Sequence, residues 1–283
     1  MFIAQYSTSY SVSRLCVVMC VSRRGYYAWR RRPCSKRDQE NKELLKAIRR
    51  IFEAHRQVYG APRIHSVLRD EGYSCSLNRV ASLMNKAGVV PKTIRKFRVT
   101  TDSRKSHRPA QNLLSRDFKA TKPNQKWVAD VTYISTREGW LFLATVLDLY
   151  SRKIVGWSMG ERLTSQLAQD ALSTAVAART PDAGVLVHSD QGREYYAGDY
   201  QALLKAHGLI CSMSRRGNCY DNAPMESFFQ KLKVEQIYHE DYRTRLEARA
   251  AVFDYIEIFY NRQRKHSSIG YQTPVGYEER LVA

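Results

Sequence analysis

The sequence predicts an α/β fold, in which a mixed five-stranded sheet with flanking helices follows an all-α helix-turn-helix region. The first observation is a change of period, because apolar residues recur at helical spacing up to residue 90 and alternate from Trp127 onward. The second is the order of elements: three consecutive strands favour an antiparallel meander, and two later strands alternate with helices. The strands are expected at residues 127–134, 141–149, 154–159, 185–187 and 209–213. The second of these is almost unbroken apolar sequence, which predicts burial on both faces.

Positive charge is concentrated in the first part of the chain. The 283 residues have a net charge of +19. Residues 1–110 contain 24 Lys and Arg against 7 Asp and Glu, whereas the remaining residues contain 22 against 20. Because Lys and Arg neutralise phosphates and release counterions, this asymmetry predicts a nucleic-acid partner. The alternative is a basic surface that serves only solubility.

Two short helices around a tight turn are expected within residues 12–31. Ser22 is a good N-cap for the second helix, which begins with Arg23 and Arg24 and mixes basic with aromatic residues. This pattern predicts a helix-turn-helix that places Arg23 and Arg24 on DNA, and the alternative is a basic hairpin that packs on its neighbours. Further helices are expected from Gln39 to Tyr59, from Arg63 and after Ser76, and they again suggest a helix-turn-helix.

The sequence divides into five segments. They are an N-terminal helix-turn-helix-like segment (1–38), a helical helix-turn-helix-like DNA-binding module (39–90), a basic linker (91–123), an α/β core (124–240) and a C-terminal helix with a basic tail (241–283). The linker is polar and has no sustained period, so we expect it to be mobile without DNA.

Two helices near the C-terminus carry apolar stripes. The helix after Pro224 should bury Met225, Phe228, Phe229 and Leu232. The polar face at the edge of this stripe consists of Glu226, Gln230 and Lys233. A last helix, residues 245–261, is expected to bury Leu246, Phe253 and Ile256.

Cysteine spacing and hydropathy exclude several classes of protein. Six cysteines are scattered without CxxC pairs or matched histidine spacing, so we expect free thiols rather than zinc ligands or disulfides. No apolar run approaches the roughly 18 residues that a membrane span needs, and the N-terminus lacks the pattern of a signal peptide. The sequence therefore predicts a cytoplasmic protein without a membrane partner.

Three carboxylates could form a metal site. Asp130 lies inside the first strand, Asp190 follows the fourth, and Glu226 lies one turn into a helix, with thirty-five residues between it and Asp190. Carboxylates held close repel one another, and a divalent ion such as magnesium removes this cost because it prefers hard oxygen ligands. Two such ions about 4 Å apart can assist an in-line displacement at phosphorus. Asp130 and Asp190 converge if the first and fourth strands are neighbours.

The spacing alone does not select these three acids. The same region contains other acids, and most carboxylates are merely solvated: Glu138, Asp148, Glu194, Asp199, Asp221 and Glu235. Asp148 is the strongest competitor because it ends a buried strand. Its alternative role is a turn or capping contact with Ser151.

Several motifs resemble one known family. They are Asn124–Ile134, Asp148–Arg152, His188–Gly192, Gly217–Phe229 and the ending from Tyr260-Asn261 through Arg264 and His266 to Thr273-Pro274. These motifs resemble the integrase-core transposases of bacterial insertion sequences, in the DDE integrase-core superfamily, and most closely the second-frame (orfB) product of the insertion-sequence-three family. Residues 48–88 are similar to the helix-turn-helix module of that family. The sequence departs from the family pattern at Arg193 and Glu194, where a small residue and Gln are commoner.

The resemblance implies an RNase H-like catalytic domain that binds two Mg²⁺ or Mn²⁺ ions. Asp130, Asp190 and Glu226 map onto its catalytic metal ligands, and Lys233 maps onto a basic residue that touches DNA near the scissile phosphate. The segment around Gly217 is expected to be a mobile loop that closes over DNA, with Tyr220 and Asn222 as further DNA contacts. The family cuts one strand at the element's ends and uses the freed 3′-hydroxyl to attack another phosphodiester.

The resemblance also implies partners and a location. The DNA partners are the terminal inverted repeats of the element and the target DNA, on which a homo-oligomer is expected. A further partner is the upstream-frame protein or its frameshift fusion, because this chain has no heptad run and looks like the downstream product alone. The expected location is the bacterial cytoplasm, at the nucleoid.

Two other functions stay open. A DNA-binding regulator would use the basic half and keep an inactive catalytic core, so that replacing Asp190 by Asn would leave every activity intact. A metal-dependent nuclease would cleave DNA without strand transfer, and joining of a labelled end to a second DNA would separate it from a transposase.

Overall fold

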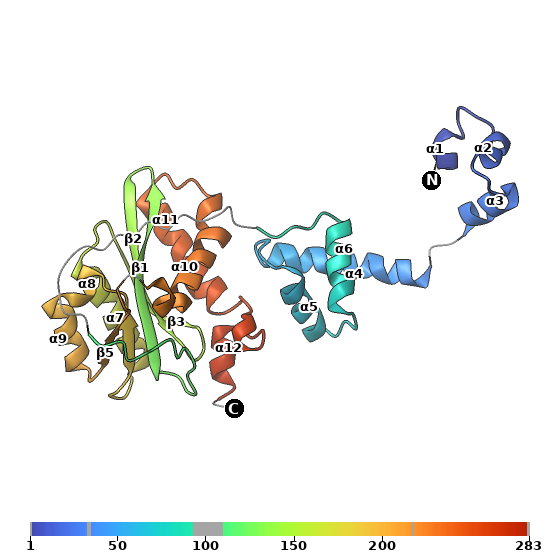
Figure 1. The fold of residues 1–283 in the computed structure, drawn as a ribbon. Coiled ribbons are helices and arrows are strands. Elements are labelled where there is room, and N and C mark those ends of the chain that lie inside the picture. The colour runs from blue at the N-terminus through green and yellow to red at the C-terminus, as the bar shows by residue number, and fades with distance from the viewer. Residues whose placement is uncertain (1, 33–34, 93–109, 217, 282–283) are drawn as a thin grey trace.

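The computed structural model of this chain describes residues 2–32, 35–92, 110–216 and 218–281. Figure 1 shows a small N-terminal helical cluster, a three-helix module and an α/β core that includes the C-terminal helices. Our expectations for residues 93–109, which form the middle of the predicted linker, and for Gly217 lie outside the described residues. No helix in the described part of the chain is both long and apolar enough to cross a membrane.

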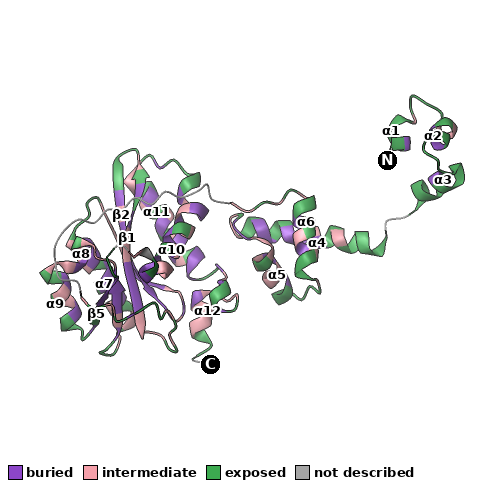
Figure 2. Cartoon of the chain, in the orientation of Figure 1, coloured by how far each residue is buried: buried purple, intermediate pink, exposed green. Residues whose placement is uncertain are grey.

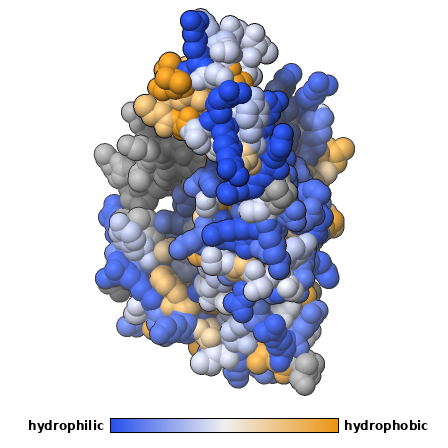
Figure 3. Space-filling model, turned by 90° about the vertical axis from the view of Figure 1, so that its right-hand side faces the viewer, coloured by the Kyte–Doolittle hydropathy of each residue, from blue (hydrophilic) through white to orange (hydrophobic). Residues whose placement is uncertain are grey.

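The N-terminal cluster consists of three short helices. They are α1 (Phe2–Tyr6), α2 (Val12–Val18) and α3 (Arg23–Arg31). Ser22 caps α3 as predicted, since its Oγ accepts a hydrogen bond from the Gly25 amide at 3.0 Å. Ile3, Leu15, Cys16 and Tyr26 form a small core of their own. Most of this cluster is exposed (Figure 2), and its exposed residues include the apolar Val17 and Val18. Figure 3, which views the molecule from the right-hand side of Figure 1, shows a group of hydrophobic residues at the top of an otherwise mostly hydrophilic surface.

The three-helix module confirms the helices predicted between residues 39 and 88. It consists of α4 (Lys36–Ala54), α5 (Ala61–Asp70) and α6 (Leu77–Lys86). Ile48, Ile64 and Val80, one from each helix, are fully buried together. The Ser76 hydroxyl caps α6 through the Arg79 amide at 3.3 Å. The short connection between α5 and α6 gives this module its helix-turn-helix character.

The α/β core contains the predicted five-stranded sheet. Its strands are β1 (Lys126–Thr136), β2 (Gly139–Asp148), β3 (Ile154–Gly160), β4 (Leu186–Ser189) and β5 (Ile210–Met213). Their order is β3-β2-β1-β4-β5. The first three strands are antiparallel, and β4 runs parallel to both β1 and β5. This arrangement is the mixed RNase H-like sheet, with β2 buried over most of its length as predicted.

Helices cover both faces of the sheet. On one face α7 (Ser165–Arg179) packs on β2 and β3, beside α8 (Arg193–Tyr196) and α9 (Gly198–Ala206). On the other face lie α10 (Ala223–Glu235) and α11 (Arg245–Phe253), and α12 (Pro274–Glu279) ends the described chain. Figure 2 shows the strands buried between these layers. Gly156 lets α7 approach closely, because a Cβ there would lie 2.3 Å from the Ala171 carbonyl oxygen.

The apolar stripe predicted on α10 is confirmed, but the stripe predicted on the last helix is wrong. Met225, Phe228, Phe229 and Leu232 are all buried. The last helix ends at Phe253 and continues as a π-helical segment, Asp254–Tyr260. Leu246 and Phe253 are exposed, although Ile256 is buried as expected; the stripe that faces the core is Ala248, Val252, Tyr255, Ile256 and Phe259. Both stripes recur at helical spacing, and periodicity alone does not show which one faces the sheet.

Two segments expected to be irregular pack on the core. In the described end of the linker, Leu114 is buried, and the amides of Leu113 and Leu114 donate to the Ser212 hydroxyl at 3.0 and 3.3 Å. The basic C-terminal segment is also buried, at Arg264 and His266. Arg264 enters the interior because the Glu235 carboxylate on α10 neutralises it there.

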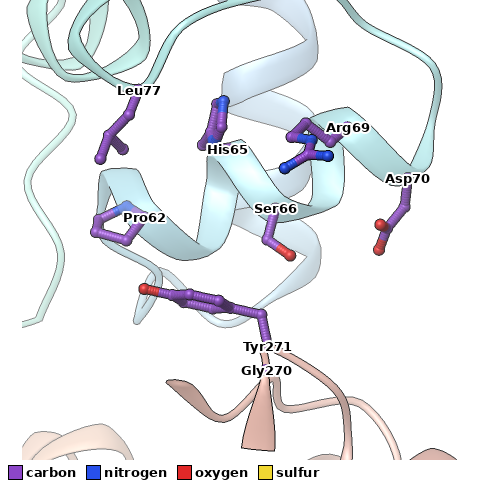
Figure 4. Close-up of a pocket in the computed structure, with 8 residues that line it drawn as sticks. All are labelled: Pro62, His65, Ser66, Arg69, Asp70, Leu77, Gly270 and Tyr271. Carbon is purple, nitrogen blue, oxygen red and sulfur yellow. The ribbon is translucent and has the colours of Figure 1, made fainter. Parts of the chain in front are cut away.

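The C-terminal segment also joins the three-helix module to the core. The Tyr59 hydroxyl donates to the Gln263 carbonyl at 3.0 Å and accepts from the Lys265 amide at 2.8 Å. Arg63 Nε donates to the Lys265 carbonyl at 3.0 Å, and the Lys265 ammonium pairs with Asp70. A pocket of about 370 Å³ lies at this junction (Figure 4); it is lined by Pro62, His65, Ser66, Arg69, Asp70, Leu77, Gly270 and Tyr271.

Candidate active site

Asp130 and Asp190 lie side by side because β1 and β4 are neighbouring parallel strands. The register pairs Val128 with His188, so Asp130 and Asp190 each follow two residues beyond a paired position. Neighbouring strands are about 4.8 Å apart, which brings the two carboxylates to one end of the sheet. Asp130 Oδ1 accepts from the Val131 amide at 2.8 Å, and Asp190 Oδ1 accepts from the Gly192 amide at 2.9 Å. The convergence that the sequence made conditional on neighbouring strands is therefore confirmed.

Neither aspartate forms a salt bridge within the described residues, although the Asp130 carboxylate interacts electrostatically with the Lys233 ammonium. Burial raises the pKa of Asp130 well above its usual range, and the charges of Asp190, Glu194 and Glu226 raise it further. Burial also raises the pKa of Asp190. The part of the chain that the structure describes gives neither carboxylate a basic ion-pair partner. Two close carboxylates with hard oxygen donors and no salt bridge to a described residue fit a divalent ion such as Mg²⁺ or Mn²⁺.

Glu226 stands apart from the two aspartates. It lies exposed in the first turn of α10, and its charge still raises the pKa of Asp130. Within the described ranges, no three Asp, Glu, His or Cys side chains gather closely enough to hold a metal ion. The structure thus brings two of the three predicted acids together and leaves the third on an adjoining helix.

A fourth carboxylate, Glu194 on α8, lies against Asp190. A Cβ added to Gly192 would lie 2.5 Å from Glu194 Oε1 and 2.9 Å from Asp190 Oδ1, so both carboxylates lie on the same side of this glycine. Burial raises the pKa of Glu194, and Asp190 raises it further. In the sequence, Glu194 stood out as a competing acid and as a departure from the family pattern, but not as a neighbour of Asp190. The signal available was its position two residues after Gly192, where the chain turns back over Asp190.

Replacing Glu194 with Gln is expected to stabilise the metal-free protein. Its raised pKa means that the ionised form is disfavoured in the fold, so Glu194 contributes stability at low pH that is lost as pH rises through its folded pKa. Removing this charge should raise the free energy of unfolding by about 1 kcal/mol at neutral pH in EDTA. Chemical denaturation at pH 7 and near pH 4 measures the gain, which should shrink at the lower pH.

The matched control for Glu194 is Asp182→Asn, which removes one exposed negative charge from the same core. It should leave the free energy of unfolding within about 0.5 kcal/mol of the unsubstituted protein. Equal changes in the free energy of unfolding would show that the charge of Glu194 is not destabilised by the carboxylates beside it.

His188, two residues before Asp190, is a structural residue. Its Nδ1 lies 2.9 Å from the Ser212 hydroxyl and its Nε2 lies 3.0 Å from the Ser214 hydroxyl. Burial lowers the pKa of His188 to about 4, which keeps the ring neutral at physiological pH. The ring ties β4 to β5 and so fixes the strand end that carries Asp190.

The other buried acids have structural partners. Asp148 accepts from the amides of Asn124 and Tyr150, both at 2.8 Å. Its predicted role in a turn is confirmed, but the predicted contact with Ser151 is wrong, because the Ser151 hydroxyl donates to Glu278 at 2.7 Å. Tertiary packing brings α12 close enough to compete for this hydroxyl.

Asp221 stabilises the segment that precedes α10. Its carboxylate pairs with Arg215 and with Arg116, at 2.8 Å each. The hydrogen bonds from Arg215, followed by those from Arg116, hold the pKa of Asp221 well below its usual range despite its burial. This ion-pair cluster fixes the 3-10 turn η1 (Cys219–Asn222), from which α10 begins.

The predicted DNA contacts differ in exposure. Lys233 is half-buried with its Nζ 4.9 Å from the centre of the Tyr133 ring, and burial lowers its pKa while Asp130 opposes this shift. Tyr220 is exposed, under the Arg116 guanidinium. Asn222 is buried and its Nδ2 donates to the Ala129 carbonyl at 3.2 Å, so its amide supports β1 in this structure. Arg23 and Arg24 are exposed on α3. DNA contact by these residues stays a prediction.

Comparisons with known proteins place this fold and site in one class. Residues 120–219 match an "Integrase core domain" family, residues 226–281 match a second family of that description, and residues 39–97 match an "HTH-like domain". The sheet, the aspartate pair and these matches define an integrase-core protein with a helix-turn-helix-like module.

The relatives identify the family. Transposase InsF for insertion sequence IS3A of Escherichia coli K12 is 44% identical over 284 residues, which cover 100% of this chain and 99% of the relative. The IS600 uncharacterized 31 kDa protein of Shigella sonnei is 44% identical over 266 residues, covering 94% of this chain and 98% of that protein. The chain belongs to the IS3 insertion-sequence transposase family, which confirms the resemblance seen in its motifs.

Solved structures of viral integrases show a more distant likeness. A chain in the structure of the simian T-cell lymphotropic virus intasome with PP2A regulatory subunit B56 gamma is 15% identical with a TM-score of 0.48, covering 75% of this chain and 69% of that one. The HTLV-2 integrase catalytic core domain in complex with magnesium is 15% identical with a TM-score of 0.40, covering 56% of this chain and 98% of that one.

Proposed function

We propose that this IS3-family transposase binds the ends of a bacterial insertion sequence, cleaves one DNA strand and joins the freed 3′-hydroxyl to a second DNA. The observation that carries the proposal is the convergence of Asp130 and Asp190 on neighbouring parallel strands, where neither forms a salt bridge with a described residue. A site that concentrates negative charge cannot hold a phosphodiester unless cations intervene. Both reactions are displacements at phosphorus, so one site serves both.

Asp130, Asp190 and Glu226 are the residues that would hold two Mg²⁺ or Mn²⁺ ions. Bound there, the ions would activate the attacking oxygen and stabilise the leaving oxygen. The sheet holds the two aspartates rigidly through the Val131 and Gly192 amides. Glu226 is carried by α10, whose apolar stripe packs on the sheet, and its charge already raises the pKa of Asp130.

Other residues of the chain would bind and orient DNA. Lys233 presents an ammonium on the same helix as Glu226, without an ion-pair partner among the described side chains. The excess of basic residues in positions 1–110 supplies general affinity for the phosphate backbone. We assign residues 1–38 and 39–90 to binding of the terminal inverted repeats, residues 91–123 to a basic linker, residues 124–240 to catalysis and residues 241–283 to a segment that joins the two.

The proposal extends to partners and place. The substrates are the element's terminal inverted repeats and a target DNA, and a homo-oligomer would hold two ends together. The upstream-frame protein, or a frameshift fusion with it, is a further partner. The bacterial cytoplasm, at the nucleoid, is where these partners are found.

Incubation of the purified protein with labelled element ends, a second DNA and Mg²⁺ tests the proposal. We expect cleavage at the 3′ end of the element, followed by a joined product that contains both DNAs. Cleavage without any joined product would identify a metal-dependent nuclease. Binding without cleavage, in the protein alone and in the frameshift fusion, would identify a DNA-binding regulator with an inactive core.

A further inference from the structure

Two large aromatic side chains are exposed on the strands β1 and β2. Tyr133 on β1 is 46% exposed, and Trp140 on β2 is 52% exposed. Their rings meet edge to face with centroids 4.9 Å apart. The register pairs Tyr133 with Phe142 and Ser135 with Trp140, so the two rings are diagonal neighbours on one face of the sheet. We name Tyr133 and Trp140 the aromatic pair.

The aromatic pair lies close to the proposed chemistry. Tyr133 follows Asp130 by three residues along β1, a separation of about 10 Å between their Cα atoms. The Lys233 Nζ lies 4.9 Å from the centre of the Tyr133 ring, and the charge of Asp130 raises the pKa of Lys233 against the effect of burial. Lys233 thus connects the aromatic pair to the site, because its ammonium lies over the Tyr133 ring and interacts electrostatically with the Asp130 carboxylate.

The aromatic pair is also held in place. The Trp140 carbonyl accepts a hydrogen bond from Arg245 Nε at 3.2 Å, and Arg245 is paired with Glu161 at 3.2 Å. Both rings belong to paired strands rather than to a loop. Rigid, half-exposed rings beside the Lys233 ammonium, which forms no salt bridge with a described residue, offer a flat apolar surface next to positive charge. Such a surface matches an unpaired nucleobase with its phosphate.

We propose that Tyr133 and Trp140 form a stacking platform for an unpaired nucleobase at the DNA end on which the carboxylates act, with Lys233 at its phosphate. Stacking accepts any base, so this contact recognises an opened DNA end rather than a sequence. The inference rests on the proposed function, because the DNA end is that of the substrate. It assigns the platform to single-stranded DNA, and not to a second copy of this chain.

Equilibrium binding to two probes tests the proposal: a blunt duplex, and the same duplex with a few unpaired bases at one 3′ end. The full-length protein should prefer the duplex with the overhang. Trp140→Ala should weaken binding to the overhang duplex about tenfold and leave binding to the blunt duplex unchanged. Trp140→Phe should restore most of the preference, because it keeps an aromatic face.

Tyr238→Ala is the matched control, since it removes another exposed aromatic ring of the core. It should leave the preference intact. Thermal unfolding of each variant confirms folding. In a Trp29→Phe background, the overhang duplex should also quench fluorescence from the exposed Trp140, and Trp140→Phe should remove this quenching.

Three results would overturn the platform. The first is that Trp140→Ala weakens binding to the blunt and overhang duplexes equally. The second is that Trp140→Ala and Tyr238→Ala have the same affinities for the two duplexes. The third is that Trp140→Ala changes the oligomeric state. The last would assign the aromatic pair to contact between copies. Failure of the unsubstituted protein and its frameshift fusion to cleave or join DNA would instead remove the proposed function, so the two failures are distinguishable.

Discussion

Asp190→Asn is expected to abolish DNA cleavage and joining while DNA binding persists. The substitution removes one of two adjacent carboxylates, which meet where β4 ends beside the middle of β1, and Asn is a poorer ligand for a hard divalent ion. We expect cleavage to fall by at least about 1,000-fold, because the ions supply most of the charge stabilisation in such displacements. A gel assay for cleavage and a binding assay on the same DNA separate the two effects. Cleavage at an undiminished rate would show that the catalytic site lies elsewhere in the chain.

The same substitution is expected to stabilise the metal-free protein. The pKa of Asp190 is raised in the fold, so its ionised form is disfavoured, and the stability it contributes at low pH is lost as pH rises through the folded pKa. Asp190→Asn should therefore raise the free energy of unfolding by about 1–2 kcal/mol at neutral pH in EDTA. Urea denaturation at pH 7 and near pH 4 should show the gain at the higher pH only.

Asp221→Asn provides a control of opposite sign. The pKa of Asp221 is lowered by Arg215 and Arg116, so its stability contribution is present above its usual pKa and is lost as pH falls. Its replacement should cost about 2 kcal/mol at pH 7, a value that allows for the solvent around both arginines. Loss of stability in both Asp190→Asn and Asp221→Asn would contradict the assignment of Asp190 to an unpaired site.

Arg264→Ala is expected to destabilise the fold more than any other single change proposed. Arg264 is 1% exposed, and its Nε donates to Glu235 Oε2 at 2.7 Å. Burial opposes the charge on Arg264, but the hydrogen bonds and charge of Glu235 outweigh it, so its pKa is raised. Removing the guanidinium leaves Glu235 buried and unpaired except for the Tyr255 hydroxyl at 2.8 Å. The expected cost is about 3–5 kcal/mol in the free energy of unfolding.

Arg262→Ala is the matched control for Arg264, because it removes an exposed arginine two residues away. It should cost less than about 0.5 kcal/mol. The double substitution Arg264→Met with Glu235→Leu should recover much of the loss, since no buried charge then remains. Equal stability of the two single arginine variants in denaturation would show that the Arg264–Glu235 pair does not hold the segment in place.

The Arg264–Glu235 pair also bears on the site, because Glu235 and Glu226 share α10. The same C-terminal segment contacts the three-helix module through Tyr59 and Arg63. One buried ion pair therefore holds the helix of Glu226 beside the module that we assign to binding DNA.

Local pattern was sufficient for most of the elements. Alternation and apolar runs predicted all five strands, and the spacing of Met225, Phe228 and Leu232 predicted the buried face of α10. Capping by Ser22 and Ser76 was also predictable, because a cap depends on a few neighbouring residues. The pairing of β1 with β4 was not predicted; it was named only as the arrangement that would bring Asp130 and Asp190 together. Parallel neighbouring strands are far apart in sequence, so local pattern does not identify them.

Long-range pairing accounts for the errors. Residues 260–268 contain several basic and polar side chains, so the sequence predicted a basic tail, but Glu235 lies on α10 and neutralises Arg264 inside the core. The buried face of α11 was misassigned because two apolar stripes recur at helical spacing and only the position of the sheet distinguishes them. The position of Glu194 against Asp190 was not predicted, because the turn at Gly192 that folds it there is a tertiary feature.

Anomalous X-ray scattering from crystals grown with Mn²⁺ shows directly whether the carboxylates bind divalent ions. We expect strong anomalous peaks within coordination distance of the Asp130 and Asp190 carboxylates, with Glu226 turned towards them. In Asp190→Asn crystals these peaks should weaken or vanish. Crystals of the unsubstituted protein with ordered Asp130 and Asp190 side chains, in saturating Mn²⁺, and no anomalous peak between them would contradict this expectation.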